Sequence, residues 1–534
     1  MVDVLIIGSG GAGLTAALSA KKEGASVIVA GKTYPTNSQT SMAQGGMNAA
    51  LGNVGGDDTS SHIADTIKSA HLLCDEKMVK KMCEEAPETI SWLERLGVPF
   101  SRLDNGKMGT QTIAQRQMGG ASAKRACYAQ DYTGLKILHT LYDTCLKEKI
   151  EFLDEHYLLN LIIENQTIKG ATFLDIHTGE VKQVDARSVI IATGGYGSLY
   201  HGFTTNAYGS TGDGVAAVLR AGGSVSDMEF IQFHPTALKH SCILISESAR
   251  GEGGYLVNES GKRFVDELKP RDEVARAIFS QMQGGERVFL DVRHLGEEKL
   301  MELLPQEVEL CKIHEHVDPS HELIPIKPVA HYTMGGIDVD DMLEVTGIKG
   351  CFAVGECSNA KVHGANRLGG NSLLEITTFG KIAGENAYAY ARSSDNAPAD
   401  GTQQQKDTVW IKSLLSQEAP VNFYPYREML GNIFYEKVGI VRENEQLQEA
   451  LNEVNSMQDD EEKMGVSDKS SENNQNLIDF LEFQNALLLA PTIISAAIQR
   501  DESRGAHYKM GFEEENETLQ KHIVFQLEKE ETCR

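Results

Sequence analysis

Positive charge is scarce in this sequence. Its 534 residues include 50 Lys and Arg against 76 Asp and Glu, which gives a formal net charge of -26. A protein that binds nucleic acid through its phosphates needs a basic surface, so this composition argues against nucleic-acid binding. Proline is also scarce, with 13 residues against 51 glycines, and hydrophobic residues make up 41% of the chain. These values are ordinary for a soluble globular protein of roughly three structural units, and the glycine excess indicates tight turns around a cofactor.

The nine cysteines include no C-x-x-C pair. Zinc sites and iron-sulfur clusters ordinarily take their ligands from closely spaced cysteines, so the sequence predicts no metal site in this chain. Scattered cysteines are typical of buried, reduced thiols and favour a cytoplasmic location. The nine are Cys74, Cys83, Cys127, Cys145, Cys242, Cys311, Cys351, Cys357 and Cys533.

Long hydrophobic runs are missing as well. No stretch reaches the roughly 18 consecutive apolar residues that indicate a membrane-spanning helix, so we expect none. Residues 1–8 carry no basic region of the kind that opens a signal peptide, and they read as a buried strand. We therefore expect the mature fold to begin at residue 1.

The first thirty residues follow the pattern strand, glycine turn, helix, strand. A strand over residues 2–7 leads into a turn with the G-x-G-x-x-G spacing, a helix over 14–22 and a second strand over 27–30. Such a turn lets the backbone approach a pyrophosphate, to which the helix N-terminus offers free N-H groups. The pattern predicts a dinucleotide-binding turn, whose glycines are Gly8, Gly10, Gly11 and Gly13.

Two later segments indicate which dinucleotide binds. Residues 189–195 form an apolar strand that ends in Ala-Thr-Gly-Gly, and residues 346–356 form another that ends in Gly355-Glu356. Together with the glycine turn, these strands resemble the FAD-binding halves of flavoproteins, so we predict FAD. The acidic residue that usually follows the second strand is missing, because Ala-Gly-Lys32 stands there, and the ribose contact must differ.

The remaining patterns divide the chain. Residues 231–325 interrupt the Rossmann pattern, with a strand-like run at 287–292 and a helical run at 297–304, and from about residue 393 helical runs dominate. We predict an α/β fold in which a Rossmann-like FAD-binding domain is interrupted by an α+β capping domain and followed by a helical C-terminal domain. The predicted boundaries are 1–230 with 326–392, then 231–325, and 393–534.

Eight further motifs accompany the glycine turn, in order from residue 42 to residue 507. They are Met42-Ala-Gln-Gly-Gly46, Gly209-Ser-Thr-Gly-Asp-Gly214, Gln232-Phe-His-Pro-Thr236, Glu247-Ser-Ala-Arg-Gly-Glu-Gly-Gly254, Pro270-Arg-Asp272, His331-Tyr-Thr-Met-Gly-Gly336, His363-Gly-Ala-Asn-Arg-Leu-Gly-Gly-Asn-Ser372 and Glu502-Ser-Arg-Gly-Ala-His507. On these motifs the sequence resembles the flavoprotein subunit of succinate dehydrogenase and fumarate reductase, with L-aspartate oxidase as the nearest relative. This resemblance implies an FAD-dependent enzyme that interconverts fumarate and succinate.

The resemblance assigns the residues that handle the dicarboxylate. It implies that His234, Ser246, His331 and Arg367 bind substrate, with Arg367 paired to one carboxylate and the histidines polarising the other. Ser246 stands where threonine is usual. At Arg271 the resemblance implies proton transfer to or from the carbon next to a carboxylate, coupled to hydride transfer between flavin N5 and the other olefinic carbon. Because arginine is a weak acid, Arg271 needs a proton supply, which the resemblance assigns to Glu247 and Arg250.

The resemblance also assigns the FAD contacts. It places Gly8, Gly10 and Gly13 at the pyrophosphate, Lys32 after the second strand and Glu356 at the ribityl chain. It places Gln44, Gly45 and Gly46 near the isoalloxazine. Asp213, Ser372 and Leu373 complete the set. Gln39 occupies the position of the histidine through which many family members bind FAD covalently, so we predict noncovalent FAD. In the family covalent attachment goes with a raised flavin potential, so fumarate reduction is expected to be favoured.

Soluble L-aspartate oxidase remains the alternative. It carries a glutamate directly before Gly119-Gly120, suited to the substrate ammonium, and this chain has Met118 there. An unsubstituted C4 dicarboxylate is therefore the better substrate, with Asp131 and Asp266 as the alternative sources of the missing acid.

The absence of cluster and haem motifs implies a partner. The family implies an iron-sulfur subunit and often a membrane anchor, which would hold the chain peripherally at the cytoplasmic membrane face. A non-enzymatic flavin-binding subunit would not need Arg271 and the histidines.

Overall fold

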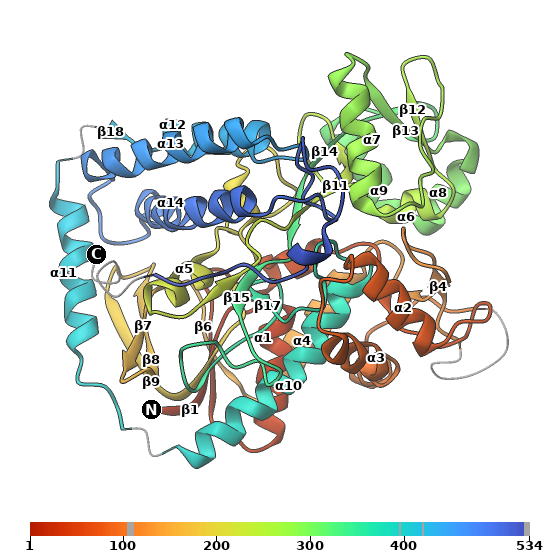
Figure 1. Ribbon diagram of the computed structural model, residues 1–534. Coiled ribbons are helices and arrows are strands. Elements are labelled where there is room, and N and C mark those ends of the chain that lie inside the picture. Colours follow the sequence, from red (N-terminus) through yellow and green to blue (C-terminus); the bar gives the residue numbers. More distant parts are fainter. Residues whose placement is uncertain (104–111, 395–396, 419–420, 528–534) are drawn as a thin grey trace.

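The computed structural model describes residues 1–103, 112–394, 397–418 and 421–527. Cys533 and the rest of the last seven residues lie outside these ranges. Figure 1 shows a central α/β region, a separate lobe containing α7, α8, β12 and β13, and a layer of C-terminal helices. The predicted fold class, an interrupted FAD-binding domain followed by a helical region, is confirmed.

The predicted first half of a Rossmann unit is present. β1 (Val2–Ile7) and β2 (Val27–Ala30) are parallel neighbours, connected by α1 (Gly11–Lys22). Gly8 has φ +114°, and a Cβ on Gly13 would lie 1.9 Å from the Gly8 carbonyl oxygen. Both positions therefore require glycine, which allows the tight turn from strand to helix.

A seven-stranded sheet carries this unit, in the order β6-β2-β1-β9-β8-β7, with β16 (Cys351–Ala353) also paired to β9 (Val181–Ile191). The C-terminal half of β9 runs parallel to β1 and β16, and its N-terminal half pairs antiparallel with β8. The carboxyl ends of β1, β9 and β16 therefore meet at one edge, where parallel α/β sheets bind ligands. The other strands are β6 (Glu151–Leu153), β7 (His156–Glu164) and β8 (Thr167–Asp175).

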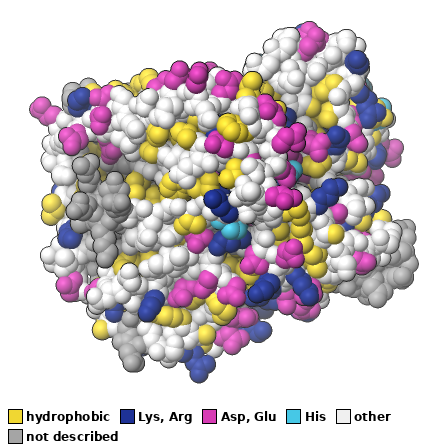
Figure 2. Space-filling view, in the orientation of Figure 1, with side chains coloured by type: hydrophobic (Ala, Val, Ile, Leu, Met, Phe, Trp, Pro, Cys, Tyr) yellow, Lys and Arg dark blue, Asp and Glu magenta, His cyan; other side chains and the backbone are white. Residues whose placement is uncertain are grey.

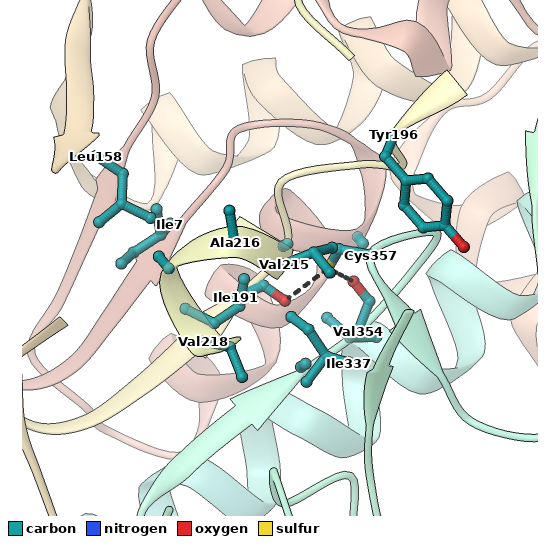
Figure 3. Packing of buried hydrophobic residues seen from close by; sticks show 14 of the residues in the cluster. Ile7, Leu158, Ile191, Tyr196, Val215, Ala216, Val218, Ile337, Val354 and Cys357 are labelled. Carbon is teal, nitrogen blue, oxygen red and sulfur yellow. Dashed lines mark hydrogen bonds between the residues drawn. The ribbon is translucent and has the colours of Figure 1, made fainter. Parts of the chain in front are cut away.

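The core beside this sheet is apolar. Figure 3 shows Val215 and Val218 of α5 (Asp213–Arg220) close to Ile191 and Cys357. The Cys357 thiol donates to the carbonyl oxygens of Ile191 (3.3 Å) and Val354 (3.4 Å), and burial raises its pKa to about 12. Further elements of this region are α2 (Thr59–Ser69), α3 (Glu76–Leu96), α4 (Thr133–Lys147), α10 (Asn371–Ser393), β3 (Met47–Asn48), β4 (Gln115–Arg116), β5 (Ala126–Cys127), β10 (Val225–Ser226), β15 (Gly336–Asp338) and β17 (Ser358–Asn359).

The predicted capping domain has its own antiparallel sheet, in the order β11-β14-β13-β12. β14 (Ile324–Thr333) pairs with β11 (Ile231–Leu238) along most of its length, so the predicted boundary between residues 325 and 326 falls inside a strand. β14 continues in this sheet to Thr333, beyond that boundary. Its other elements are α6 (Glu247–Gly251), β12 (Tyr255–Asn258), α7 (Arg271–Gln283), β13 (Val288–Asp291), α8 (Glu297–Leu303) and α9 (Pro305–His314).

Four helices dominate the C-terminal region. α14 (Gln475–Gln499) is long and apolar enough to cross a membrane, with a mean hydropathy of 1.4. No such helix was expected from the sequence, because polar residues interrupt its apolar residues. Its apolar window is 72% buried inside the molecule, which is typical of the core helix of a domain. The other elements are α11 (Thr402–Ser416), β18 (Val421–Asn422), α12 (Tyr424–Lys437), α13 (Asn444–Asp460) and β19 (Met464–Gly465).

Between residues 500 and 527, the described part of the segment after α14, one short turn at Glu517–Leu519 is helical. The segment returns to the FAD-binding region, where β20 (Val524–Phe525) pairs with β10. Buried Arg500 forms ion pairs with Glu229 and Glu502 on the way. On the face seen in Figure 2, acidic side chains are spread widely and Lys and Arg occur singly or in small groups, in keeping with the negative net charge.

Candidate active site

One large cavity lies at the carboxyl ends of β1, β9 and β16 and extends to the insertion. Its volume is about 300 Å³, within the range of roughly 300–1,000 Å³ for a small-molecule pocket. Its wall runs from the glycine turn to the charged residues of the insertion, so one continuous site can hold a dinucleotide beside a small substrate. The predicted site residues that line it are Gly8, Gly10, Gly11, Lys32, Gln39, Gln44, Gly45, Gly46, Asp213, His234, Ser246, Glu247, Arg271, His331, Glu356, Arg367, Ser372 and Leu373. Gly13 and Arg250 lie behind Gly8 and Glu247 respectively and do not line it.

The cavity wall near the glycine turn fits a polar cofactor such as FAD. Among the described residues, the buried oxygens Ser38 Oγ, Gln44 Oε1 and Thr193 Oγ1 have no hydrogen-bond partner, and all three residues line the cavity. Buried polar atoms are normally satisfied, so these three indicate a missing polar group. Gly10 caps α1 without a side chain, which leaves the helix N-terminus open to a phosphate.

Lys32 and Asp213 were predicted as separate FAD contacts, and the structure joins them in an ion pair. Lys32 Nζ also lies 2.7 Å from Glu482 Oε1 on α14. Although burial would lower the pKa of Lys32, the two carboxylates raise it above its ordinary value. Lys32 is therefore a cation fixed at the cavity wall. Sequence reasoning missed Glu482, which lies 450 positions away on a helix with no motif.

Glu356 follows β16 and faces the cavity. Its Oε1 accepts from the backbone N-H of Thr333 at 3.0 Å. Burial raises the pKa of Glu356 to about 7, so this carboxyl group can donate as well as accept near neutral pH. It thus suits the hydroxyls of a ribityl chain. Ser372 and Leu373 lie in the first turn of α10, which begins after Gly370 (φ +86°).

Gln39 also faces the cavity and is held in place. Its Oε1 accepts from the backbone N-H of Ala207 at 2.8 Å. An amide side chain is not a nucleophile.

A buried charge cluster lies at the other end of the cavity. Arg271, the first residue of α7, donates to Glu247 Oε2 from Nη2 (2.7 Å) and Nε (3.1 Å). Arg250 Nη2 donates to the other oxygen of Glu247 at 3.3 Å. Burial would raise the pKa of Glu247, but the two guanidinium groups hold it below its ordinary value. The three predicted proton-handling residues therefore form one continuous hydrogen-bonded chain.

Arg367 and the two predicted histidines complete this end. Burial, and next the positive charge of Arg271, lower the pKa of Arg367 to about 10, so it remains a cation at neutral pH. Its Nε has no hydrogen-bond partner among the described residues. The rings of His234 and His331 lie 4.8 Å apart. Burial and neighbouring charges hold the pKa of both well below the ordinary value, so both are neutral. The arrangement offers a carboxylate one cation and two uncharged polar rings.

Ser246 caps the short helix α6, and its hydroxyl accepts from the Ser248 N-H at 3.1 Å. Its own N-H donates to Glu307 Oε1 at 3.1 Å. Sequence reasoning missed Gln232, whose Oε1 accepts from both Arg271 (3.0 Å) and Arg367 (3.2 Å). The signal was present, because Gln232 opens the motif that contains His234.

Met118 lines the cavity, whereas Asp131 and Asp266 do not. Among the described residues, the acids that line it are Asp213, Glu247 and Glu356, all engaged as described above. No unengaged acid therefore faces this cavity from the described part of the chain. In the same part, no group of His, Cys, Asp and Glu side chains could hold a metal ion.

Comparisons with known proteins agree with this arrangement. The family described as FAD binding domain matches residues 3–373, and the family described as fumarate reductase flavoprotein C-term matches residues 427–533. The 8-methylmenaquinol:fumarate reductase flavoprotein subunit of Wolinella succinogenes is 40% identical over 529 residues, which cover 95% of this chain and 85% of the relative. The succinate dehydrogenase flavoprotein subunit of Rickettsia bellii is 37% identical over 547 residues, covering 96% and 91%.

A solved structure of FrdA from E. coli quinol fumarate reductase superposes with a TM-score of 0.93 at 36% identity, covering 99% of this chain and 95% of that one. The flavoprotein of Mycobacterium smegmatis Sdh1 gives a TM-score of 0.87 at 33% identity, covering 99% and 92%. The chain therefore belongs to the family of fumarate reductase and succinate dehydrogenase flavoprotein subunits, which are FAD-dependent oxidoreductases.

Proposed function

We propose that this flavoprotein interconverts fumarate and succinate and favours fumarate reduction. The observation that carries the proposal is the chain Arg271-Glu247-Arg250, which reaches a cavity also lined by Arg367 and two neutral histidines. Arg367 pairs with one carboxylate of the substrate. His234, His331 and Ser246 bind the other and orient the olefin.

When bound in its reduced form, FAD would supply a hydride from its N5 to one olefinic carbon. Arg271 gives a proton to the other olefinic carbon, next to a carboxylate, so that fumarate gains two hydrogens and becomes succinate. Glu247 accepts two hydrogen bonds from Arg271 and returns a proton to it. Arg250 in turn supplies a proton to Glu247. Because Glu247 is held ionised by both arginines, it is ready to receive each incoming proton.

The FAD contacts assigned from the sequence, from Gly8 to Leu373, remain part of this proposal. We infer that FAD is bound noncovalently, since Gln39 offers no nucleophile and hydrogen-bonds to Ala207. Acid precipitation tests this directly: the yellow colour is expected in the supernatant, and a yellow pellet would contradict the inference. Without a covalent substituent the flavin potential is expected to stay low, which favours reduction of fumarate over oxidation of succinate.

We further propose that the chain works as the catalytic subunit of a complex with an iron-sulfur protein and, through it, a membrane anchor. The described residues hold no cluster of metal ligands, so electrons must reach the flavin from outside this part of the chain. The proposed location is the cytoplasmic face of a membrane. Native mass and iron content of the purified particle would distinguish a complex from a free flavoprotein.

The decisive assay compares two reactions. The purified protein is mixed anaerobically with a reduced viologen dye, and dye oxidation is followed after fumarate is added. In parallel, oxygen consumption is followed aerobically after L-aspartate is added. Fumarate-dependent dye oxidation is expected. Oxygen consumption with L-aspartate would instead favour the alternative of an aspartate oxidase. Against that alternative, each acid that lines the cavity from the described part of the chain already has a partner.

A further inference from the structure

Asp131 lies in the FAD-binding region, in the turn between β5 and α4, but its side chain serves a helix of the insertion. Its Oδ2 accepts from the backbone N-H groups of Gln306 (2.8 Å) and Glu307 (3.1 Å). These are the second and third residues of α9, and they are the donors that an N-cap side chain normally satisfies.

α9 has no such cap of its own. Its N-cap position is Leu304, whose side chain cannot accept a hydrogen bond, and its first residue, Pro305, has no N-H group. Asp131 therefore replaces the missing cap from outside the insertion. Burial raises the pKa of Asp131, a tendency that the two N-H groups partly oppose.

The turn that carries Asp131 is fixed against the predicted flavin wall. The N-H of Gly134 donates to the Ala43 carbonyl oxygen at 2.7 Å, and Thr133 Oγ1 donates to the Gln44 carbonyl oxygen at 3.3 Å. From the same turn, Gln130 Nε2 donates to the Glu302 carbonyl oxygen of α8 at 3.2 Å. The turn thus contacts the flavin-binding segment on one side and the α8-α9 junction on the other.

The next contact leads to the substrate end of the cavity. Glu307, which receives the cap through its N-H, accepts from the N-H of Ser246 through Oε1 at 3.1 Å. Asp131, Glu307 and Ser246 are all buried. Burial, and next the charge of Asp131, hold the pKa of Glu307 well above its ordinary value, which favours the uncharged form of this side chain. In that form Glu307 positions Ser246 without placing a negative charge beside a dicarboxylate.

We propose that Asp131 is a positioning residue for the substrate site: by capping α9 across the domain boundary, it sets Ser246, through Glu307, at a fixed place relative to the flavin wall. The inference rests on the proposed function, because Ser246 is assigned to substrate binding there. It gives Asp131 a role other than that of an ammonium ligand, from which its position outside the cavity excludes it in this structure.

The test uses the flavin-loaded protein and two readouts. Amide hydrogen exchange of a peptide that contains residues 305–308 reports on the cap. Asp131→Ala is expected to increase the exchange of the Gln306 and Glu307 amides by about fivefold or more, and Asp131→Asn, an equally good cap, should leave it near the wild-type rate. Unchanged exchange in Asp131→Ala would overturn the capping role.

Steady-state fumarate reduction reports on the coupling to Ser246. Asp131→Ala is expected to raise KM for fumarate by about fivefold with a smaller change in kcat. Asp131→Asn should keep KM near the wild-type value. In the Ser246→Ala background, Asp131→Ala should raise KM further by less than about twofold, because the Ser246 hydroxyl that Asp131 helps to position is already missing. Additive effects, or an Asp131→Asn variant as impaired as Asp131→Ala, would overturn the proposal.

Glu307→Ala provides a second route if Asp131→Ala does not fold. It removes the contact to Ser246 from within the insertion and leaves the cap in place. It should raise KM without increasing the exchange of the 305–308 amides, and a wild-type KM would overturn the proposal. A wild-type KM in Ser246→Ala would refute the proposed substrate role of Ser246, and with it the link to substrate, while hydrogen exchange still reports on the cap.

Discussion

Replacing Arg271 with glutamine tests the proton-transfer assignment most directly. A positioned general acid contributes about 10²- to 10⁴-fold, so turnover should fall by at least about a hundredfold once protonation relies on water. Glu247 keeps two partners in this variant, Arg250 at 3.3 Å and the N-H of Gly119 at 3.1 Å, so no buried charge is left alone. The variant is therefore expected to fold and to bind FAD.

Dicarboxylate affinity should fall much less than turnover in the same variant. Removing Arg271 takes one positive charge from the cluster, but Arg367 is already a cation at neutral pH and stays one. KM for fumarate is expected to rise by no more than about tenfold, so most of the loss appears in kcat.

The assay is fumarate-dependent oxidation of a reduced viologen dye, with flavin content measured by absorbance and succinate affinity by the flavin spectrum. Arg276→Gln is the matched control, because Arg276 lies on the same helix α7, pairs with Asp272 and does not line the cavity. It should turn over at nearly the wild-type rate. Turnover of Arg271→Gln within tenfold of wild type would refute the proton-transfer role.

Two further perturbations test other parts of the site. Met118→Glu places a carboxylate beside Gly45 and Ser246, and should raise KM for fumarate at least about tenfold, whereas the uncharged Met118→Gln should raise it less; equal effects would exclude charge as the cause. Burial lowers the pKa of His62 from 6.5 to about 4, so the unfolded chain binds its proton first as the pH falls. Stability that is complete above pH 6.5 should decline by about 3 kcal/mol towards pH 4, and urea unfolding of His62→Gln should show a smaller decline. An equal decline in both proteins would contradict this.

Local sequence patterns predicted the parts of the fold whose cause is local. The glycine turn was predictable because Gly8 and Gly13 approach each other within one turn, and only glycine fits there. Helical runs were predicted after residue 400, and the structure has helices there over Thr402–Ser416, Tyr424–Lys437, Asn444–Asp460 and Gln475–Gln499. The course of the chain at the end of the insertion depends on a distant contact, because residues 324–333 form one strand that pairs with β11, nearly a hundred positions earlier.

The site divides in the same way. The motifs predicted which residues line the cavity, since each motif carries its own backbone geometry. The partners of those residues were not predictable where the contact joins distant segments without a motif. Glu482 reaches Lys32 across 450 positions, and Asp131 caps a helix 175 positions away. Asp131 attracted attention as a carboxylate, but only the fold shows that its partners are backbone N-H groups.

Charge balance in the cluster explains why a dicarboxylate suits it. Arg250, Arg271 and Arg367 are three cations and Glu247 is one anion, which leaves two positive charges while the histidines are neutral. Buried charges that have no partner destabilise a protein. A dianion of the right length pairs with both positive charges, whereas a monoanion pairs with only one of them. Fumarate should therefore raise the thermal unfolding temperature of the flavin-loaded protein well above the effect of crotonate, in which a methyl group replaces one carboxylate. A ligand at about a hundred times its Kd adds roughly 2.7 kcal/mol, enough to measure. Equal stabilisation by fumarate and crotonate at the same ionic strength would show that the second carboxylate of the substrate does not pair with the positive charge of the cluster.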